Sequence, residues 1–367
     1  MKKRLFSLLL VSALVFTLSG CGEKSLLRES DPVTLNFWHV YGEQSGSPMD
    51  LLVQEFNRTV GQEKGVRVQV TNLSSASKIG GFLKEAQKGG RDAPEMPDLF
   101  TCHISDATAL GSDNLVDWNA RFTAEELSNF VPGFLADGMT EDGTLLLFPI
   151  SKSTQLLMCN GSGFARSLAQ GHVVVSDLYS NTQVMTGDVL SGLGSSAAIL
   201  YYNDTVTYRD GTQEPMDLHV LPMPKTAGAD ALMTQAGVGL CAYKTTDQKA
   251  EAAALFVRWL TESERNLDFV AQTGYMLVRN GAFDAIENYD KFPEPTESYR
   301  QLYAALKIMQ ESYTPLSEPR FEGYYGKVSQ LYDGLRQMQQ KLPARAAAGE
   351  SIDTLAEETW ALLCAIH

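Results

Sequence analysis

The sequence predicts an α/β protein made of two lobes, and three observations support this. A chain of 367 residues exceeds what one hydrophobic core usually organises, since cores stop growing near roughly 250–300 residues. Strand-like segments alternate with amphipathic helical segments in the first third, which is typical of a parallel sheet flanked by helices. A hydrophobic content of 44%, with 20% charged residues, is that of an ordinary globular protein.

The chain begins with a pattern typical of an exported protein. Residues 1–20 carry Lys2, Lys3 and Arg4, then an apolar run of about 14 residues, then small residues. That run is short for a membrane span, which needs roughly 20 residues. The final four positions, 18–21 (LSGC), resemble the lipobox of bacterial lipoproteins, so we expect a lipid on Cys21 and a location at the extracytoplasmic face of the cell membrane. The alternative is an ordinary signal peptide followed by an incidental cysteine.

The segment at 21–31 is polar and lacks periodicity, so it is predicted to be a tether between anchor and body. The folded body then begins at Pro32. Its first half alternates strands and helices in the order strand 33–38, helix 48–60, strand 66–70, helix 79–86, strand 97–101, helix 123–130 and strand 143–149. Ser47 before Pro48 and the Thr123–Glu126 capping box predict two of the helix starts.

The second half has fewer strands and more helices. Strand-like runs are expected near 197–202, 218–224 and 236–243. Capping boxes at 245–248 and 261–264 predict two successive helices, the second ending at Gly274. From about residue 284 onward the chain is predicted to be wholly helical.

Charge and cysteine content exclude several classes of function. The chain has 30 basic and 44 acidic residues, a net charge of −14, which argues against a nucleic-acid surface and against a patch that binds anionic membranes. Four cysteines besides Cys21 lie without metal-ligand spacing, so no metal or other cofactor is expected. They allow three disulfide pairings, and the sequence does not choose among them. We expect Cys102 and Cys241 to be buried free thiols because both lie in apolar runs.

Several short segments, taken in order, resemble family 1 extracellular solute-binding proteins, the sugar receptors of ABC importers. The segments are 35–42 (LNFWHVYG), 55–57 (EFN), 97–100 (PDLF), 148–149 (FP), 153–154 (ST), 221–224 (LPMP), 236–239 (AGVG), 253–260 (AALFVRWL) and 274–275 (GY). No single segment is specific. Their order over nearly the whole chain, together with the lipobox, carries the resemblance.

The resemblance implies a two-lobed fold of the type II periplasmic-binding-protein kind, with ligand held between the lobes. Lobe one would comprise residues 32–150 and 232–283, and lobe two residues 151–231 and 284–367. Relatives carry several helices after the Ser-Thr strand, whereas here Asn160 is followed at once by a Gly-Ser-Gly turn. We therefore expect a shortened second lobe. An internal deletion, an error in the sequence and an authentic minimal variant all remain open.

Candidate ligand-binding residues are aromatic and planar polar side chains near strand ends and lobe crossovers, because sugars bind to aromatic faces and to such polar groups. From the chain itself, the loop after the first strand, the end of the 97–101 strand and the turn before 197 provide Trp38, His39, Tyr41, Glu43, His103, Ser195 and Ser196. The family resemblance adds Ser153, Thr154 and Tyr275 at the crossovers. Core packing is the competing interpretation for Trp38 and Tyr275, and ordinary strand hydroxyls for Ser153 and Thr154.

Catalysis finds little support in the sequence. None of the five histidines has the spacing of a zinc hydrolase, and no G-x-S-x-G elbow is present. The first hypothesis is therefore a non-enzymatic, lipid-anchored receptor that delivers a carbohydrate to the permease subunits of an ABC transporter. The second is a degenerate receptor-like lipoprotein that acts as an interaction or sensor subunit. A glycosidase comes third, because distant carboxylate pairs leave no local signature.

Overall fold

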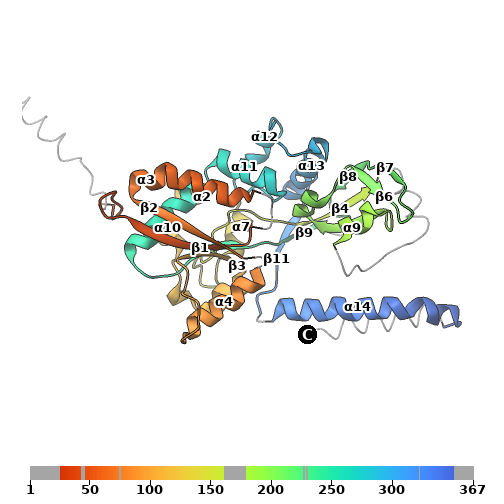
Figure 1. The fold of residues 1–367 in the computed structure, drawn as a ribbon, viewed down its shortest axis with the longest axis horizontal. Coiled ribbons are helices and arrows are strands. Elements are labelled where there is room, and N and C mark those ends of the chain that lie inside the picture. Colours follow the sequence, from red (N-terminus) through yellow and green to blue (C-terminus); the bar gives the residue numbers. More distant parts are fainter. Residues whose placement is uncertain are drawn as a thin grey trace, which may run out of the picture.

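The computed structural model describes residues 25–42, 46–73, 76–160, 179–225, 228, 230–321 and 323–350. These residues form two lobes, each built around its own sheet. One sheet has four strands in the order β10-β3-β1-β2, and the other has three in the order β5-β4-β8. The lobes lie side by side along the longest axis of the molecule (Figure 1).

The four-stranded sheet is mainly parallel, as the alternating pattern predicts. Strand β1 (Val33–His39) pairs in parallel with β2 (Val66–Asn72) and β3 (Leu99–Cys102), while β10 (Gly239–Ala242) is antiparallel to β3. The carboxyl ends of β1, β2 and β3 therefore meet at one edge of the sheet. Loops that follow this edge are where open α/β sheets place ligand-binding groups.

Helices cover this sheet on both faces. They are α2 (Pro48–Arg58), α3 (Val60–Lys64), α4 (Ala76–Lys88), α5 (Ile104–Leu110), α10 (Asp247–Leu260) and α11 (Ser263–Thr273). Helix α2 begins as predicted, because the Ser47 hydroxyl accepts a hydrogen bond from the backbone N–H of Asp50. Its buried side chains are Met49, Val53 and Phe56, which recur at helical spacing.

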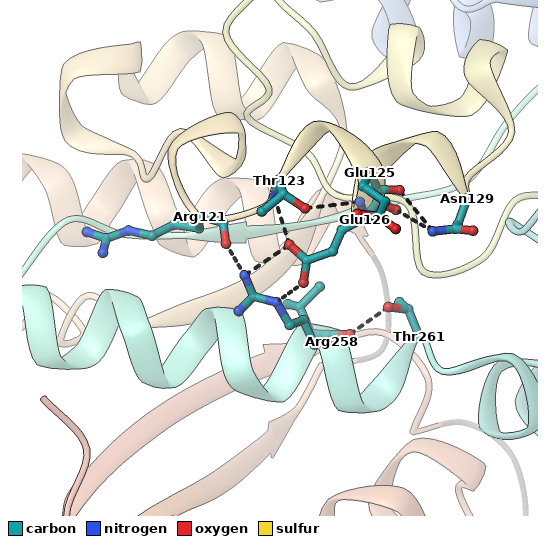
Figure 2. Close-up of polar contacts among 8 residues, drawn as sticks. Arg121, Thr123, Glu125, Glu126, Asn129, Arg258 and Thr261 are labelled. Atoms are coloured by element: carbon teal, nitrogen blue, oxygen red, sulfur yellow. Dashed lines mark hydrogen bonds and ion pairs between the residues drawn. The ribbon is translucent and has the colours of Figure 1, made fainter. Parts of the chain in front are cut away.

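Four short helical segments lie between α5 and residues 143–149 in the chain. They are the 3-10 turns Ser112–Asn114 and Trp118–Ala120, then α6 (Ala124–Ser128) and α7 (Pro132–Asp137). The predicted capping box at α6 is present, with Thr123 and Glu126 bonded reciprocally (Figure 2). Arg258 of α10 also donates from Nε to Glu126 at 2.5 Å and lies over the Phe122 ring. This ties α6 to α10.

The second lobe surrounds β4 (Gln155–Asn160), which pairs antiparallel with both β5 (Ser191–Ser195) and β8 (Leu218–Leu221). Around it lie α9 (Ser180–Met185), the 3-10 helix η4 (Ser196–Tyr201) and the β6–β7 hairpin (Thr205–Thr207 and Gln213–Pro215). Helix α13 (Thr296–Ser312) packs on β8 and η4. One contiguous cluster of buried apolar side chains runs through both lobes.

The chain passes between the lobes from α11 to α13 and at three further connections. Residues 151–154 lead into β4, β9 (Leu232–Gln235) leads to β10, and β11 (Thr314–Ser317) leads from α13 back toward the first lobe. Strands β9 and β11 pair in parallel with each other. Helix α12 (Ala282–Ile286) lies between α11 and α13 in the chain, and α14 (Tyr324–Ala347) follows β11. No helix within the described ranges is long and apolar enough to cross a membrane.

Several predicted elements differ from the structure. Residues 143–149 make only isolated bridges at Leu145 and Phe148 rather than a strand. Residues 197–202 lie mostly in the 3-10 helix η4, because the strand β5 ends before them. Strand β11 interrupts the region that was predicted to be wholly helical, and this strand exists only because β9 provides a partner for its backbone.

Two predicted capping boxes are also displaced. The cap of α10 is Thr246, whose hydroxyl accepts from the N–H of Lys249, one residue later than expected. Helix α11 starts after Glu262, which makes no side-chain cap. The hydroxyl of Thr261 instead donates to the Val257 carbonyl at 2.8 Å, because it is buried against the preceding helix.

The predicted tether is wrong for residues 25–31, which are bonded to the first lobe. The prediction of buried thiols is confirmed, since Cys102 and Cys241 are free and fully buried, with sulfur atoms 3.8 Å apart. Cys21, Cys364 and the side chain of Cys159 lie outside what the structure describes, so their disulfide state stays open.

Candidate functional site

The candidate site lies where the chain crosses between the sheets, next to the carboxyl ends of β1 and β3. Backbone bonds brace the crossover: Ser153 exchanges hydrogen bonds of 3.0 Å with Ala236, and Lys152 forms a bridge with Met276. Neighbouring chain segments from both lobes are therefore in contact at this point. A crossover of this kind is a candidate hinge.

Three predicted hydroxyl residues meet at the crossover. Ser153 and Thr154 are buried, and the Thr154 carbonyl accepts from the N–H of Ser196 at 2.8 Å. Within the described part of the chain, the side-chain oxygens of Thr154 and Ser196 have no hydrogen-bond partner. A buried hydroxyl without a partner costs about 1–3 kcal/mol. A movement that separates the lobes and wets these hydroxyls would recover part of that free energy.

Ser195 lies at the start of η4, and its hydroxyl accepts from the N–H of Ala197 at 3.3 Å. This bond caps the 3-10 helix, so the structure gives Ser195 a local role at the edge of the crossover. Glu43, from the loop after β1, lies outside the described residues.

His39 supports the loop that follows β1. Its side chain is fully buried, Nδ1 accepts from the N–H of Tyr41 at 3.1 Å, and Nε2 lies 3.0 Å from Asp50 Oδ1. Because Nδ1 is an acceptor, the proton is on Nε2 and is donated to the carboxylate. Burial lowers the pKa of His39, despite the attraction of Asp50. His39 is thus neutral and connects the loop after β1 to α2, and its side chain has no exposed surface that a ligand could contact.

Tyr41 is likewise internal in the structure. Its hydroxyl lies 3.0 Å from Ser151 Oγ, and its ring meets the rings of Phe269 and Tyr275 edge to face at 5.1 and 5.9 Å. Burial raises the pKa of Tyr41 above its usual range. Tyr275 is partly buried, and its carbonyl accepts from the Tyr303 hydroxyl at 3.0 Å. Both tyrosines contribute to the packing at the crossover, which for Tyr275 is the predicted core-packing alternative.

Trp38 keeps an accessible aromatic surface. It is partly buried at the carboxyl end of β1 and lies edge to face with Phe82 of α4, with ring centroids 6.3 Å apart. The Phe82 side chain is 39% exposed. The two rings form an aromatic pair that the sequence revealed only in part, because Phe82 belongs to the apolar face of a predicted helix.

His103 lies at the end of β3 and contacts the C-terminal part of the chain. Its Nδ1 is 2.9 Å from the Tyr325 hydroxyl, and the two rings are 4.6 Å apart. Glu318 lies 3.9 Å from the same nitrogen. Burial, helped by the positive charge of Lys152, lowers the pKa of His103 to about 4. The predicted site residue is therefore neutral near pH 7 and is covered by a tyrosine.

A buried charge pair lies behind this contact. Lys152 is almost fully buried at the crossover and forms an ion pair with Asp137 at the end of α7. Burial raises the pKa of Glu318, and the Tyr325 hydroxyl donates to its carboxylate. Arg320 donates to the carbonyls of α7, including Asp137 at 3.2 Å. A cation at the carboxyl end of a helix is favourable, so residues 318–325 are docked on the first lobe.

Exposed aromatic rings gather where this docked segment begins α14. Phe321 and Tyr325 are 47% and 39% exposed, and the Phe321 ring is 5.6 Å from Tyr324. Sequence reasoning missed this group because Tyr325 and His103 are 222 positions apart. Its only local signal is the density of aromatics at 321–325.

The chemistry available here is recognition by aromatic faces and hydrogen-bonding groups. Among the described residues, no group of three or more His, Cys, Asp and Glu side chains is arranged to hold a metal ion. The accessible aromatic groups are Trp38, which is paired with Phe82, and Phe321 and Tyr325, the latter in ring contact with His103. Such an arrangement suits a ligand with apolar C–H faces and hydroxyl groups.

No family model matches the chain, and no curated protein does. Solved structures do match. The cyclic alpha-maltosyl-1,6-maltose binding protein of Arthrobacter globiformis is 14% identical, with a TM-score of 0.62 over 92% of this chain and 99% of that one. UgpB of Mycobacterium tuberculosis, solved with glycerophosphocholine, is 15% identical, with a TM-score of 0.62 over 91% and 99%. A family 1 extracellular solute-binding protein of Alicyclobacillus acidocaldarius is 13% identical, with a TM-score of 0.61 over 90% and 97%.

These likenesses confirm the predicted fold, and the resemblance that the sequence showed is borne out at that level. The matches extend over nearly the full length of the solved chains, so they do not show the shortened second lobe that was expected.

Proposed function

We propose that this chain, which has the two-lobed fold of ABC substrate-binding proteins, is a lipid-anchored extracytoplasmic receptor that delivers a carbohydrate to ABC permease subunits. The fold is the first support, because structures that share it include receptors solved with or named for sugars. The lipobox ending in Cys21 supports the anchor and the extracytoplasmic location. The lobes would be residues 32–150 with 232–283, and residues 151–231 with 284–367, of which residues 318–325 contact the first lobe.

The observation that carries the carbohydrate assignment is the presence of accessible aromatic rings at the ends of two neighbouring strands, the Trp38–Phe82 pair at β1 and the Tyr325 ring against His103 at β3. Sugar rings stack their C–H faces on aromatic side chains, while planar polar groups bind their hydroxyls. Trp38 and Phe82 form an aromatic pair at the end of β1, and the Tyr325 ring lies 4.6 Å from the His103 ring at the end of β3. The binding residues proposed are therefore Trp38, Phe82, His103 and Tyr325, with Thr154 and Ser196 at the hinge.

Nothing in the described site calls for chemistry on the ligand, so the proposed receptor is not an enzyme. A glycosidase needs two carboxyl groups that flank the scissile bond, either about 5–5.5 Å or about 6.5–9.5 Å apart. The carboxyl groups near His103 are instead engaged: Asp106 is hydrogen-bonded to the His103 backbone, Glu318 accepts from Tyr325, and Asp137 pairs with Lys152.

A thermal-shift screen of residues 22–367, expressed without the lipid, tests the proposal against mono- and oligosaccharides. A cognate sugar at a hundredfold excess over its dissociation constant stabilises the folded state by about 2.7 kcal/mol. Trp38→Ala should abolish the shift, whereas Tyr332→Ala, which removes an exposed aromatic further along α14, should retain it. Each variant is compared with its own melting temperature without sugar. A cooperative melt with no shift for any sugar would refute the carbohydrate assignment.

A second candidate function is an interaction or sensor subunit, and one observation favours it. Tyr325 already covers His103, so the site is partly closed by the chain itself. A subunit of this kind would show no sugar-dependent shift. Its two lobes would nevertheless unfold in a cooperative transition.

A further inference from the structure

Residues 318–325 lead from β11 into α14 and are bonded to the first lobe at two points. Arg320 donates to three carbonyls at and just after the end of α7, among them that of Asp137 at 3.2 Å. Five residues later, the Tyr325 ring lies against the His103 ring at the end of β3. The guanidinium group has a planar, fixed set of donors, so several bonds to carbonyls hold this segment in a defined place beside β3.

The side chains of Glu318, Tyr325 and His103 form a chain of hydrogen bonds whose direction can be assigned. The Tyr325 hydroxyl is bonded both to the Glu318 carboxylate and to His103 Nδ1, the latter at 2.9 Å. An ionised carboxylate only accepts, so the single hydroxyl proton of Tyr325 is donated to Glu318. His103 Nδ1 must then donate to the Tyr325 oxygen, and the imidazole ring is the Nδ1–H tautomer.

The protonation states of the three groups agree with this direction. Burial, followed by the hydrogen bond to Glu318 and its charge, raises the pKa of Tyr325, so the hydroxyl keeps its proton. Burial lowers the pKa of His103 to about 4, so the ring is neutral at pH 7. The reverse direction would need a proton on Glu318. Burial raises the pKa of Glu318, but the bond from Tyr325 and the positive charge of Lys152 favour its ionised form, and the side chain is 28% exposed.

The assigned tautomer leaves a lone pair on His103 Nε2. Among the residues that the structure describes, this nitrogen has no hydrogen-bond partner, and the His103 side chain is 20% exposed. Strand β3 pairs with β1, which ends with the accessible Trp38 ring and its partner Phe82. His103 Nε2 is therefore a hydrogen-bond acceptor available to a ligand at the candidate site.

We propose that Glu318 is a positioning residue: through Tyr325 it fixes His103 as an acceptor, so that the site selects a neutral ligand that donates a hydroxyl group to Nε2. The proposal rests on the carbohydrate-binding function proposed above and narrows its ligand class. A sugar hydroxyl has a proton to donate. A phosphate monoester, whose second pKa is about 6, is mostly a dianion at pH 7 and offers only acceptor oxygens. Such a group would place its negative oxygens against the lone pair of His103 Nε2.

The tautomer is measured by NMR on the ¹⁵N-labelled chain 22–367 at pH 7, because long-range ¹H–¹⁵N correlations distinguish protonated from unprotonated ring nitrogens. His103 should have its proton on Nδ1. His39, whose Nδ1 accepts from the Tyr41 N–H, should have its proton on Nε2 and is the internal control. His103→Gln identifies the His103 signals by their loss. A proton on Nε2 of His103 in the parent protein would overturn the proposal.

Substitutions of Glu318 test its role directly. Glu318→Ala leaves the Tyr325 proton free to be donated to His103 Nδ1, so the ring proton should move to Nε2. The ratio of the Nδ1–H to the Nε2–H form should fall roughly fivefold or more, as expected for one net hydrogen bond. Glu318→Gln, whose amide oxygen still accepts, should restore the parent ratio, and Tyr332→Phe, at an exposed tyrosine further along α14, should not change it. An unchanged ratio in Glu318→Ala would refute the positioning role.

The ligand class is tested by titration of glucose, maltose and each further sugar that raises the melting temperature, beside their monodeoxy and monophosphate analogues. At least one monodeoxy analogue should bind the parent protein roughly tenfold more weakly than the sugar, because Nε2 is left without a donor. In Glu318→Ala this difference should disappear. Phosphate esters that all bind as tightly as the parent sugars would overturn the predicted selectivity.

The two measurements separate this proposal from the proposed function. The NMR spectra need no ligand, so a proton on Nε2 of His103 overturns the proposal even if a sugar binds. If no sugar raises the melting temperature and the proton is on Nδ1, the proposed function is refuted while the positioning role of Glu318 stands.

Discussion

Replacing Gly274 with alanine tests how tightly the two lobes are joined at the crossover. Gly274 ends α11 with φ +67 and lies against η4 of the second lobe. A Cβ at this position would be 2.6 Å from Ile199 Cγ2 and 2.9 Å from the Ser196 carbonyl oxygen. The substitution therefore adds backbone strain and a steric clash with the neighbouring lobe.

The two effects have separate magnitudes. An alanine in the left-handed region costs about 1 kcal/mol. Overpacking against a backbone carbonyl, which cannot move aside like the end of a flexible side chain, costs about 1–3 kcal/mol. The free energy of unfolding should thus fall by about 2–4 kcal/mol in total, which corresponds to roughly 3–6 °C in melting temperature for a chain of this size.

Gly281→Ala is the matched control. Gly281 has φ +68, nearly the same as Gly274, but a Cβ there would meet nothing within 4 Å. This variant should lose only the backbone part, about 1 kcal/mol. Urea unfolding followed by circular dichroism compares the two. Equal losses in both variants would refute the argument that the α11–η4 contact is close-packed.

Three further predictions concern buried groups. Because burial lowers the pKa of His103 to about 4, unfolding takes up a proton between about pH 6.5 and 4. The free energy of unfolding should therefore fall by up to about 3 kcal/mol over this range, and the raised pKa of Glu318 should oppose part of this fall. In urea unfolding, His103→Gln should show a weaker dependence of stability on pH in this range. Asp137→Asn leaves a buried lysine unpaired and should cost about 3 kcal/mol in calorimetry, whereas Arg209→Ala, at an exposed pair, should cost under about 1 kcal/mol. The Cys102 thiol, with its pKa raised by burial, should react with a disulfide reagent at least a hundredfold faster in urea than in buffer.

The parts of the fold that the sequence predicts well depend on neighbouring residues. The alternation in β1 and the Ser47 cap of α2 are local, and both are present in the structure. The strand expected at 143–149 is the instructive error. Its apolar side chains are buried as a strand's would be, but its backbone forms bridges only at Leu145 and Phe148. The N–H groups of Leu146 and Leu147 both donate to the Gly138 carbonyl, which interrupts the regular pairing of a strand.

The sequence predicts the candidate-site residues at the strand ends but not those that come from the C-terminal part of the chain. Strand ends indicated Trp38 and His103, yet the partner of His103 comes from α14, and no local pattern connects Tyr325 with β3. Burial also separates residues that look alike in sequence. His39 and His103 both follow buried strands, but His39 is bonded to Asp50 in the interior, whereas His103 is at the boundary with the C-terminal segment.

The anchor and the hinge act on different lobes, and this determines what ligand binding can move. Residues 25–31 bond to α10 and lie against the α3–β2 turn, both within the first lobe. If that lobe is fixed beside the membrane, rotation about the Ser153–Ala236 crossover displaces the three-stranded sheet and α13. Strand β1 is about 20 Å long, at roughly 3.3 Å per residue, and this is the distance between the start of the strand beside residues 25–31 and its end beside the crossover. A permease that distinguishes the open from the closed receptor would then do so by contacting the second lobe, whose position changes while the first lobe stays in place.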